Sequence, residues 1–234
     1  MTQSPRITRR TAFHGLGILG AAGAIGLLAP TAAGNAGSAA GTAMDLLVPD
    51  TEANVDTDLV VVDQTGTGAW EGENCGPTSV LIALVAVGNP PAGYVSGEAG
   101  TKIGANAEPV QELRTLCGLS PHDDPAAKNV DYWGAYLSDL ERGIEASGST
   151  AARVLYRAGV NAAAAGEAVI LQVHHGTLIG DPEADYSHFV VAQGTDADGN
   201  ILVSDPGRAQ SIGITWYSRE HLIEARQGRA TLVR

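Results

Sequence analysis

The residues best suited to chemistry stand in the octet Glu73–Val80, which reads Glu-Asn-Cys-Gly-Pro-Thr-Ser-Val and continues into an apolar run over 81–87. Pro77 suits the first turn of a helix, because the N–H that it lacks would have no partner there. Cys75 is therefore expected at a helix N-terminus, where the helix dipole and free N–H groups favour thiolate over thiol. The octet predicts a nucleophilic cysteine, with a buried structural cysteine as the alternative.

A nucleophilic cysteine needs a base, and the base needs a group that orients it. His188 begins one predicted strand and Asp205 follows the next, with an Asp-Gly pair at 198–199 between them. Such a pair favours a hairpin turn, which would bring the imidazole and the carboxylate together across adjacent strands. Asp205 would then fix the imidazole tautomer and stabilise an imidazolium that faces Cys75. The three residues predict a thiol catalytic triad.

Two further histidines, His174 and His175, end an apolar run just before Gly176 and are rival bases. Neither has a carboxylate at a comparable hairpin position, so His188 is favoured. Asp196, Asp198 and Asn200 resemble part of a calcium loop but lack its terminal glutamate, and we predict a turn there. No metal and no cofactor is predicted.

The elements that must position these residues predict an α+β fold, with helices mainly in the first half and an antiparallel sheet in the second. A short strand is expected at 59–62, before a glycine-rich loop. Helices are predicted at 77–87, 108–117, 132–146, 161–165 and 219–227, and a turn region at 120–129. Strands are predicted at 152–156, 168–173, 188–193, 201–204 and 213–216, with an edge strand at 230–233.

The first 43 residues indicate an export signal and linker, followed by a mobile leader over 44–58 and the enzyme domain over 59–234. Arg9 and Arg10 precede the apolar stretch 16–28, which holds no acidic residue, and this pattern resembles a twin-arginine (Tat) signal. The stretch is shorter than the roughly 20 residues that cross a bilayer, so no stable membrane span is expected after signal removal. Cleavage is expected within 31–43, and the product is expected outside the cytoplasm.

The formal net charge of −12 argues against a nucleic-acid partner, because phosphates require a basic surface. The predicted signal carries three of the 14 basic residues and none of the 26 acidic ones, so the remainder is more acidic still. Cys75 and Cys117 are the only cysteines. A nucleophilic Cys75 must stay reduced, which leaves Cys117 as a core residue; a disulfide between them is the alternative in an exported protein.

Three segments together resemble the papain-like cysteine peptidases of family thirty-nine and their stand-alone relatives. They are Gln64 and Trp70 leading into the octet, Ser187–Val191, and Asn200–Pro206. The resemblance implies a papain-like fold, in which a central N-terminal helix bearing the cysteine packs on an antiparallel sheet bearing the histidine and the aspartate. It implies Cys75 as nucleophile, His188 as general base and acid, and Asp205 as orienting residue. Gln64 would complete an oxyanion hole with the Cys75 backbone N–H.

Family members that trim bacteriocin leaders are attached to membrane transporters, whereas no transporter domain is predicted here. A double-glycine leader is therefore not the expected substrate. We expect an exported thiol hydrolase that cleaves amide bonds of a peptide or protein through an acyl-thioester on Cys75. The alternatives are acyl transfer on the same triad, as in a transglutaminase-like or amide-forming enzyme, and a non-catalytic binding module. The oligomeric state is left open.

Overall fold

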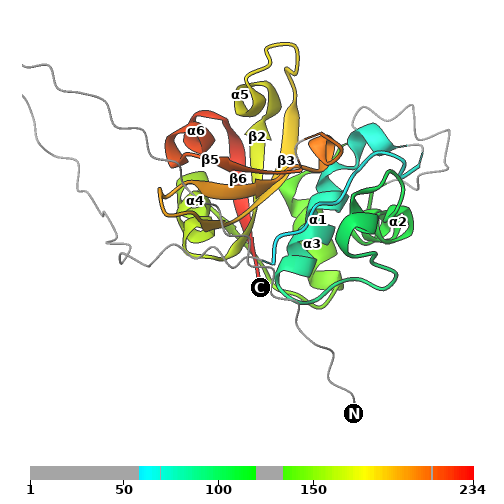
Figure 1. Cartoon of the computed structure of the whole chain (residues 1–234). Helices are drawn as coiled ribbons and strands as arrows, with labels where there is room; N and C mark the ends of the chain where they lie inside the picture. Colours follow the sequence, from blue (N-terminus) through cyan, green and yellow to red (C-terminus); the bar gives the residue numbers. More distant parts are fainter. Residues whose placement is uncertain (1–57, 69, 120–133, 212) are drawn as a thin grey trace, which may run out of the picture. The chain divides into compact units, whose positions relative to one another are not determined.

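The computed structural model describes residues 58–68, 70–119, 134–211 and 213–234 (Figure 1), all within one unit that spans Leu46–Arg234. The predicted signal, the leader up to residue 57 and the turn region 120–129 lie outside the described residues. No helix among the described residues is long and apolar enough to cross a membrane.

Six antiparallel strands form one sheet in the order β1-β6-β2-β3-β4-β5. The strands are β1 Ala151–Val154, β2 Ala168–His174, β3 Ser187–Thr195, β4 Ile201–Ser204, β5 Ile214–Tyr217 and β6 Arg226–Val233. The α-helices are α1 Cys75–Ala86, α2 Ala107–Leu116, α3 Leu137–Ala146, α4 Tyr156–Ala164, α5 His175–Ile179 and α6 Arg219–Glu224. The expected α+β class with an antiparallel sheet is confirmed.

Helices cover both faces of the sheet, as Figure 1 shows for α1, α2 and α3 on one side and α4 and α6 on the other. Neighbouring residues of β2 contribute to opposite cores: Ile170 joins the cluster with α1, whereas Val169 and Leu171 join the cluster with α4. This division follows from the two-residue period of a strand, which points successive side chains to opposite faces. Because both faces are covered, the central strands read as continuous apolar runs rather than as alternating ones.

The helix α1 lies at the centre of one core and is buried along nearly its whole length. The Ser79 hydroxyl donates to the Phe189 carbonyl oxygen at 3.0 Å, which ties the first turns of α1 to β3. Gly76 is needed for the close packing of α1 against Leu140 of α3 and against Ala135, since a Cβ atom there would lie 2.8 Å from Leu140 Cδ2 and 2.9 Å from Ala135 Cβ. The papain-like arrangement expected above is the observed one: the cysteine-bearing helix packs on the sheet that carries His188.

Several predicted elements need correction. Residues 59–62 form no strand, because the segment is held by isolated bonds from the Ser204 hydroxyl to Val60 O and from Gln64 N–H to Pro206 O. The predicted edge strand 230–233 is the end of β6, which pairs with β1 on one side and β2 on the other. Its position near the chain end gave no indication that it is inserted between two earlier strands.

The remaining differences concern element lengths. The helix α6 ends at Glu224 rather than at 227, because β6 begins at Arg226. The helix predicted from 132 begins at Leu137, and its first two predicted residues lie outside the described ones. The short alanine helix is longer than predicted and starts at Tyr156, whose side chain is buried against the second core. The helix α5, which carries a histidine at its first position, was not predicted at all.

Candidate active site

Cys75 is the first residue of α1 and is partly exposed, with a free thiol. It follows the 3₁₀ turn η1 (Glu71–Glu73) and the N-cap residue Asn74. A thiol in this position meets the free N–H groups of the first helical turn. The sequence-based expectation of a cysteine at a helix N-terminus therefore matches the geometry.

Asn74 is the residue just before Cys75, and its side chain is fully buried. Its Nδ2 donates to Thr67 Oγ1 at 2.8 Å, and its Oδ1 accepts from Arg114 Nη1 at 2.9 Å. The Arg114 guanidinium also lies over the Trp70 ring, 5.2 Å from its centroid. A buried arginine on α2 thus holds the loop that places Cys75. Sequence reasoning missed Arg114, although its spacing from Val110 puts it on the buried face of α2.

His188 and Asp205 lie side by side at the end of the β3–β4 pair, as the hairpin argument predicts. His188 Nε2 is 2.7 Å from Asp205 Oδ1, and both side chains are buried. Asp205 is also the N-cap of the 3₁₀ turn η4 (Pro206–Arg208), where its Oδ1 accepts from Gly207 N–H at 2.9 Å. The Cys75 side chain lies close enough to His188 to raise the pKa of the imidazole. Because Asp205 occupies Nε2, Nδ1 is the ring nitrogen left for the thiol.

His188 and Asp205 each favour the charged form of the other. Burial alone lowers the pKa of His188, but hydrogen bonds to Asp205 and Cys75 and their negative charges outweigh it and raise this pKa to about 10. For Asp205, burial raises the pKa, yet hydrogen bonds from His175 and His188 hold it well below its usual range. Asp205 is therefore a carboxylate at neutral pH and favours an imidazolium beside Cys75.

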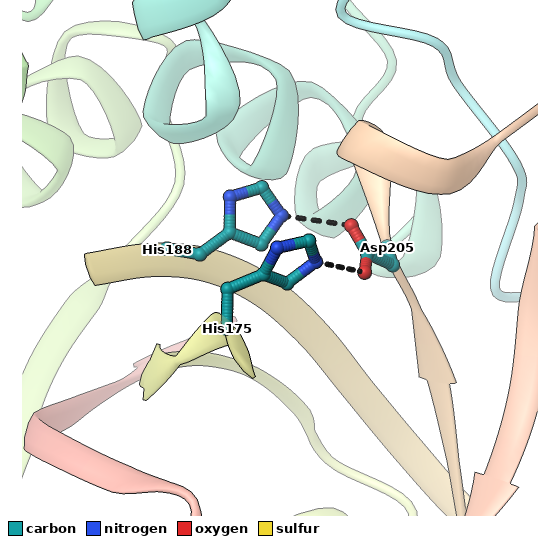
Figure 2. Close-up of side chains that lie close together, drawn as sticks. All are labelled: His175, His188 and Asp205. Atoms are coloured by element: carbon teal, nitrogen blue, oxygen red, sulfur yellow. Dashed lines mark hydrogen bonds and ion pairs between the residues drawn. The ribbon is translucent and has the colours of Figure 1, made fainter. Parts of the chain in front are cut away.

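His175, the first residue of α5, is a third member of this cluster. Its Nε2 lies 3.1 Å from Asp205 Oδ2, and its side chain is buried. Figure 2 shows the two imidazoles approaching Asp205 together, each facing a different carboxylate oxygen. Sequence analysis favoured His188 because neither His174 nor His175 has a carboxylate at a comparable hairpin position, yet His175 shares Asp205 and His174 Nε2 lies 2.9 Å from Asp185 Oδ1.

The rival bases have both ring nitrogens engaged. His175 Nδ1 lies 2.5 Å from the Tyr186 hydroxyl, and its Nε2 faces Asp205. His174 Nδ1 accepts from Thr177 N–H at 3.1 Å, and its Nε2 faces Asp185. Of the three histidines, His188 is the one whose recorded contacts include Cys75. The geometry thus favours His188 as the base.

His175, His188 and Asp205 could also hold a divalent cation, because their ligand atoms all lie within 4.8 Å of one another and all three residues are buried. Two imidazoles and a carboxylate are suitable zinc donors. Here the Nε2 atom of each imidazole is already paired with one oxygen of the Asp205 carboxylate. It is the one such cluster of three or more candidate ligands among the residues that the structure describes.

Gln64 lies beside the cluster through its backbone, whose N–H donates to Pro206 O at 3.1 Å. Its Nε2 donates to the carbonyl oxygens of Glu71 at 3.0 Å and Gly72 at 3.5 Å, while its Oε1 is buried without a hydrogen-bond partner. The carboxamide therefore bonds to the turn that leads into Cys75. The role of Gln64 as an oxyanion donor stays a prediction.

Cys117 is buried at the C-terminal end of α2, and both cysteines are free. Burial, aided by the charge of Asp139, raises the pKa of the Cys117 thiol to about 12. Gly143 makes room for this sulfur, since a Cβ atom there would lie 2.4 Å from Cys117 Sγ. Cys117 is a packed core residue, as expected of it if Cys75 is the nucleophile.

An open cavity of about 620 Å³ lies beside the loop 66–68 and the exposed side of α2. Neither Cys75 nor His188 lines it. Thr67 is the residue that links the cavity to the loop before the thiol, because it lines the cavity and its hydroxyl accepts the hydrogen bond from Asn74. The cavity is therefore a neighbour of the candidate active site rather than its reaction pocket.

Replacing Gly207 with alanine tests how closely the His188 ring is held. A Cβ atom at this position would lie 3.1 Å from His188 Cε1 and 3.3 Å from Nε2, so the ring must shift by a few tenths of an ångström. We expect kcat to fall by about tenfold with little change in Tm, because catalysis tolerates misplacement poorly. Gly72→Ala is the matched control, since nothing lies within 4 Å of the added atom. Equal activity of both variants would show that the ring position is not critical.

The depressed pKa of Asp205 predicts acid sensitivity. The carboxylate contributes stability that is fully present above its unfolded pKa of about 3.9 and is lost as pH falls toward the lower folded value. Urea titrations between pH 4 and pH 2 should show the unfolding free energy of the wild type falling more steeply than that of Asp205→Asn, by up to about 1.4 kcal/mol per pH unit. Parallel profiles would contradict this prediction.

Solved structures similar to this chain include two peptidase structures, both at low identity. One is the peptidase domain of Streptococcus ComA, a bifunctional ABC transporter involved in a quorum-sensing pathway, with a TM-score of 0.49, 14% identity, and 74% of this chain and 96% of that chain covered. The other is a double-glycine-motif protease from an AMS/PCAT transporter in complex with the leader peptide, with a TM-score of 0.45, 13% identity, and 77% and 95% covered. No protein-family model and no curated protein matches the chain.

Proposed function

We propose that this protein is an exported thiol hydrolase, a peptidase that cleaves amide bonds through an acyl-thioester on Cys75. The observation that carries the proposal is the position of His188, which hydrogen bonds with the Asp205 carboxylate and lies close enough to Cys75 for the sulfur to raise the pKa of the imidazole. A nucleophile, a base and an orienting group in this order constitute the machinery of acyl transfer. The raised pKa of His188 supports an imidazolium that can stabilise a Cys75 thiolate at neutral pH.

In the acylation step, the Cys75 thiolate attacks the carbonyl carbon of the scissile amide. A C–S bond forms, and the carbonyl oxygen takes up the negative charge. The backbone N–H of Cys75 at the start of α1 is one donor for this oxygen, and Gln64 is the proposed second, if its carboxamide turns away from Glu71 O. The C–N bond then breaks as the His188 imidazolium gives its proton to the leaving amine.

In the deacylation step, neutral His188 takes a proton from water, which attacks the thioester carbonyl. The C–S bond breaks, the carboxylic acid leaves, and the thiolate–imidazolium pair is restored. Asp205 keeps its negative charge throughout and holds the ring in one orientation. Neither step needs a metal ion, an oxidant or a cofactor from another source.

Export through a twin-arginine signal is part of the proposal, and its support is the sequence pattern around Arg9 and Arg10. Two tests address it directly. Mass spectrometry of the exported protein should find a new N-terminus within or just after 31–43. The joint substitution of Arg9→Lys and Arg10→Lys should retain the chain in the cytoplasm, and continued export of that variant would contradict the Tat route.

The activity is tested with the mature protein and a peptide library, with products identified by mass spectrometry. We expect cleavage that disappears in Cys75→Ala and persists in Cys117→Ala, because the buried Cys117 thiol takes no part. A reaction that appears only when a primary amine is added would assign acyl transfer instead of hydrolysis. A Cys75 that does not react with iodoacetamide in the reduced, folded protein would overturn the enzyme proposal itself.

A further inference from the structure

The Asp205 carboxylate is held by two imidazoles, and a triad uses only one of them. His188 Nε2 faces Oδ1 at 2.7 Å and His175 Nε2 faces Oδ2 at 3.1 Å, as drawn in Figure 2. Oδ1 also accepts from Gly207 N–H, whereas His175 is the partner recorded for Oδ2. His175 thus bonds the carboxylate oxygen that His188 does not.

The hydrogen-bond partners assign the His175 tautomer. A carboxylate only accepts hydrogen bonds, so the Nε2 atoms of both histidines must carry hydrogens. In neutral His175 the other nitrogen, Nδ1, is then an acceptor, and the Tyr186 hydroxyl at 2.5 Å must donate to it. The result is a continuous row of bonded groups from Tyr186 through His175 and Asp205 to His188, whose ring lies close to Cys75.

We propose that His175, with its ring held by the Tyr186 hydroxyl, is a second positioning residue that fixes the Asp205 carboxylate and so keeps His188 aligned with Cys75. The inference rests on the proposed thiol chemistry and adds two residues to it. His175 does not touch the reacting atoms, because both of its ring nitrogens are engaged elsewhere. It acts through Asp205.

Burial gives this role its strength. His175 and Asp205 are 3% and 5% exposed, so water does not replace a lost partner of Oδ2 easily. The rings of His175 and His188 also lie 4.4 Å apart, so a change at one affects the packing of the other. The far end of the row reaches the surface, since Tyr186 is half-exposed and its ring lies edge-on to His188 with centroids 6.2 Å apart.

The test measures the rate of Cys75 alkylation by iodoacetamide as a function of pH, which needs no substrate. His175→Leu removes the donor to Oδ2 and should lower the rate at pH 6 by about tenfold, the effect of one lost bond to a charged group. His175→Gln can place an N–H near the former Nε2 and should restore most of that rate. Tyr186→Phe removes the hydrogen bond that holds His175 Nδ1 and should lower the rate by about threefold.

Matched controls use residues outside the row. His221→Gln and Tyr94→Phe make the same changes of side chain away from Asp205 and should give the wild-type pH profile. Thermal unfolding of each variant separates misfolding from misalignment, and the half-exposed position of Tyr186 makes Tyr186→Phe the safest variant if His175→Leu does not fold.

The outcomes separate this inference from the proposed function. If wild-type Cys75 is reactive at pH 6 but Tyr186→Phe and the foldable His175 variants keep its pH profile, the positioning role is wrong and the triad stands. If wild-type Cys75 reacts only at alkaline pH, the thiol chemistry itself fails. Loss of reactivity in His175→Leu with recovery in His175→Gln would support the positioning role, because a purely structural defect leaves the shape of the pH profile unchanged.

Discussion

Replacing His188 with glutamine is expected to lower kcat/KM for peptide cleavage by about 10²- to 10⁴-fold, the range for loss of a general acid–base group. His188 supplies the proton to the leaving amine and takes one from water, and no neighbour among the described residues can take over. The nearest imidazole, that of His175, has its nitrogens bonded to Tyr186 and Asp205. Steady-state kinetics on a peptide that the wild type cleaves would measure the effect.

The same variant should lose the reactivity of Cys75 at low pH. An ordinary thiol with a pKa of about 8.5 is less than about 1% thiolate at pH 6, so without the imidazolium the alkylation rate should drop by about 10- to 10²-fold. Cys117 serves as an internal control, since burial raises its pKa to about 12 and it should not be labelled. His221→Gln controls for the substitution itself. Unchanged labelling in His188→Gln would remove His188 from the mechanism.

Replacing Asp205 with asparagine is expected to lower kcat/KM by about 10²- to 10⁴-fold, the equivalent of the roughly 3–5 kcal/mol lost when one partner of a buried ion pair is removed. The oxygen of the new side chain should take the place of Oδ1, because Gly207 N–H and His188 Nε2 both donate there. The amide nitrogen would then face His175, which must shift its proton to Nδ1. The orientation of His188 survives, but the charge that stabilises its imidazolium is lost.

This reasoning separates two roles of Asp205. The apparent pKa of the acidic group in the pH–rate profile, which belongs to the imidazolium, should fall in Asp205→Asn, because the carboxylate raises the pKa of His188 in the wild type. Asp185→Asn is the matched control, since Asp185 pairs with the more exposed His174 outside the candidate site. Full activity of Asp205→Asn would mean that orientation alone suffices and that the charge of Asp205 is not used.

The parts of the site that sequence could predict are local. Pro77 and the apolar run after it indicate a helix, so the position of Cys75 at its start follows from residues within one or two turns. His188 and Asp205 meet because the Asp-Gly turn between them folds two short apolar runs into a hairpin. His175 reaches the same end of the sheet through the pairing of β2 with β3, which sets Val173 opposite His188, two residues before His175.

Other contacts join segments that are far apart in the sequence, so no local sequence pattern predicts them. Arg114 reaches Asn74 only because α2 packs beside α1. Its buried charge is stabilised by the hydrogen bond to Asn74 and by the Trp70 ring beneath the guanidinium. The carbonyl oxygen of Pro206 accepts a hydrogen bond from the Gln64 backbone N–H and holds Gln64 beside the cluster, although the two residues are far apart in the sequence. The strand β6 lies between β1 and β2 because its apolar residues fill both cores, although its place at the chain end suggested an edge.

The sequence alone therefore determined which residues could do chemistry, the α+β class, and the pairing of one histidine with one carboxylate, because helix starts and hairpins are set by short-range preferences. Tertiary structure alone decided how Asp205 is shared. Its second oxygen is bonded by His175, whose other ring nitrogen is held by the Tyr186 hydroxyl. Buried polar groups must find partners wherever the packed chain brings them, and the folded arrangement of β2, β3, α5 and η4 decides which ones they find.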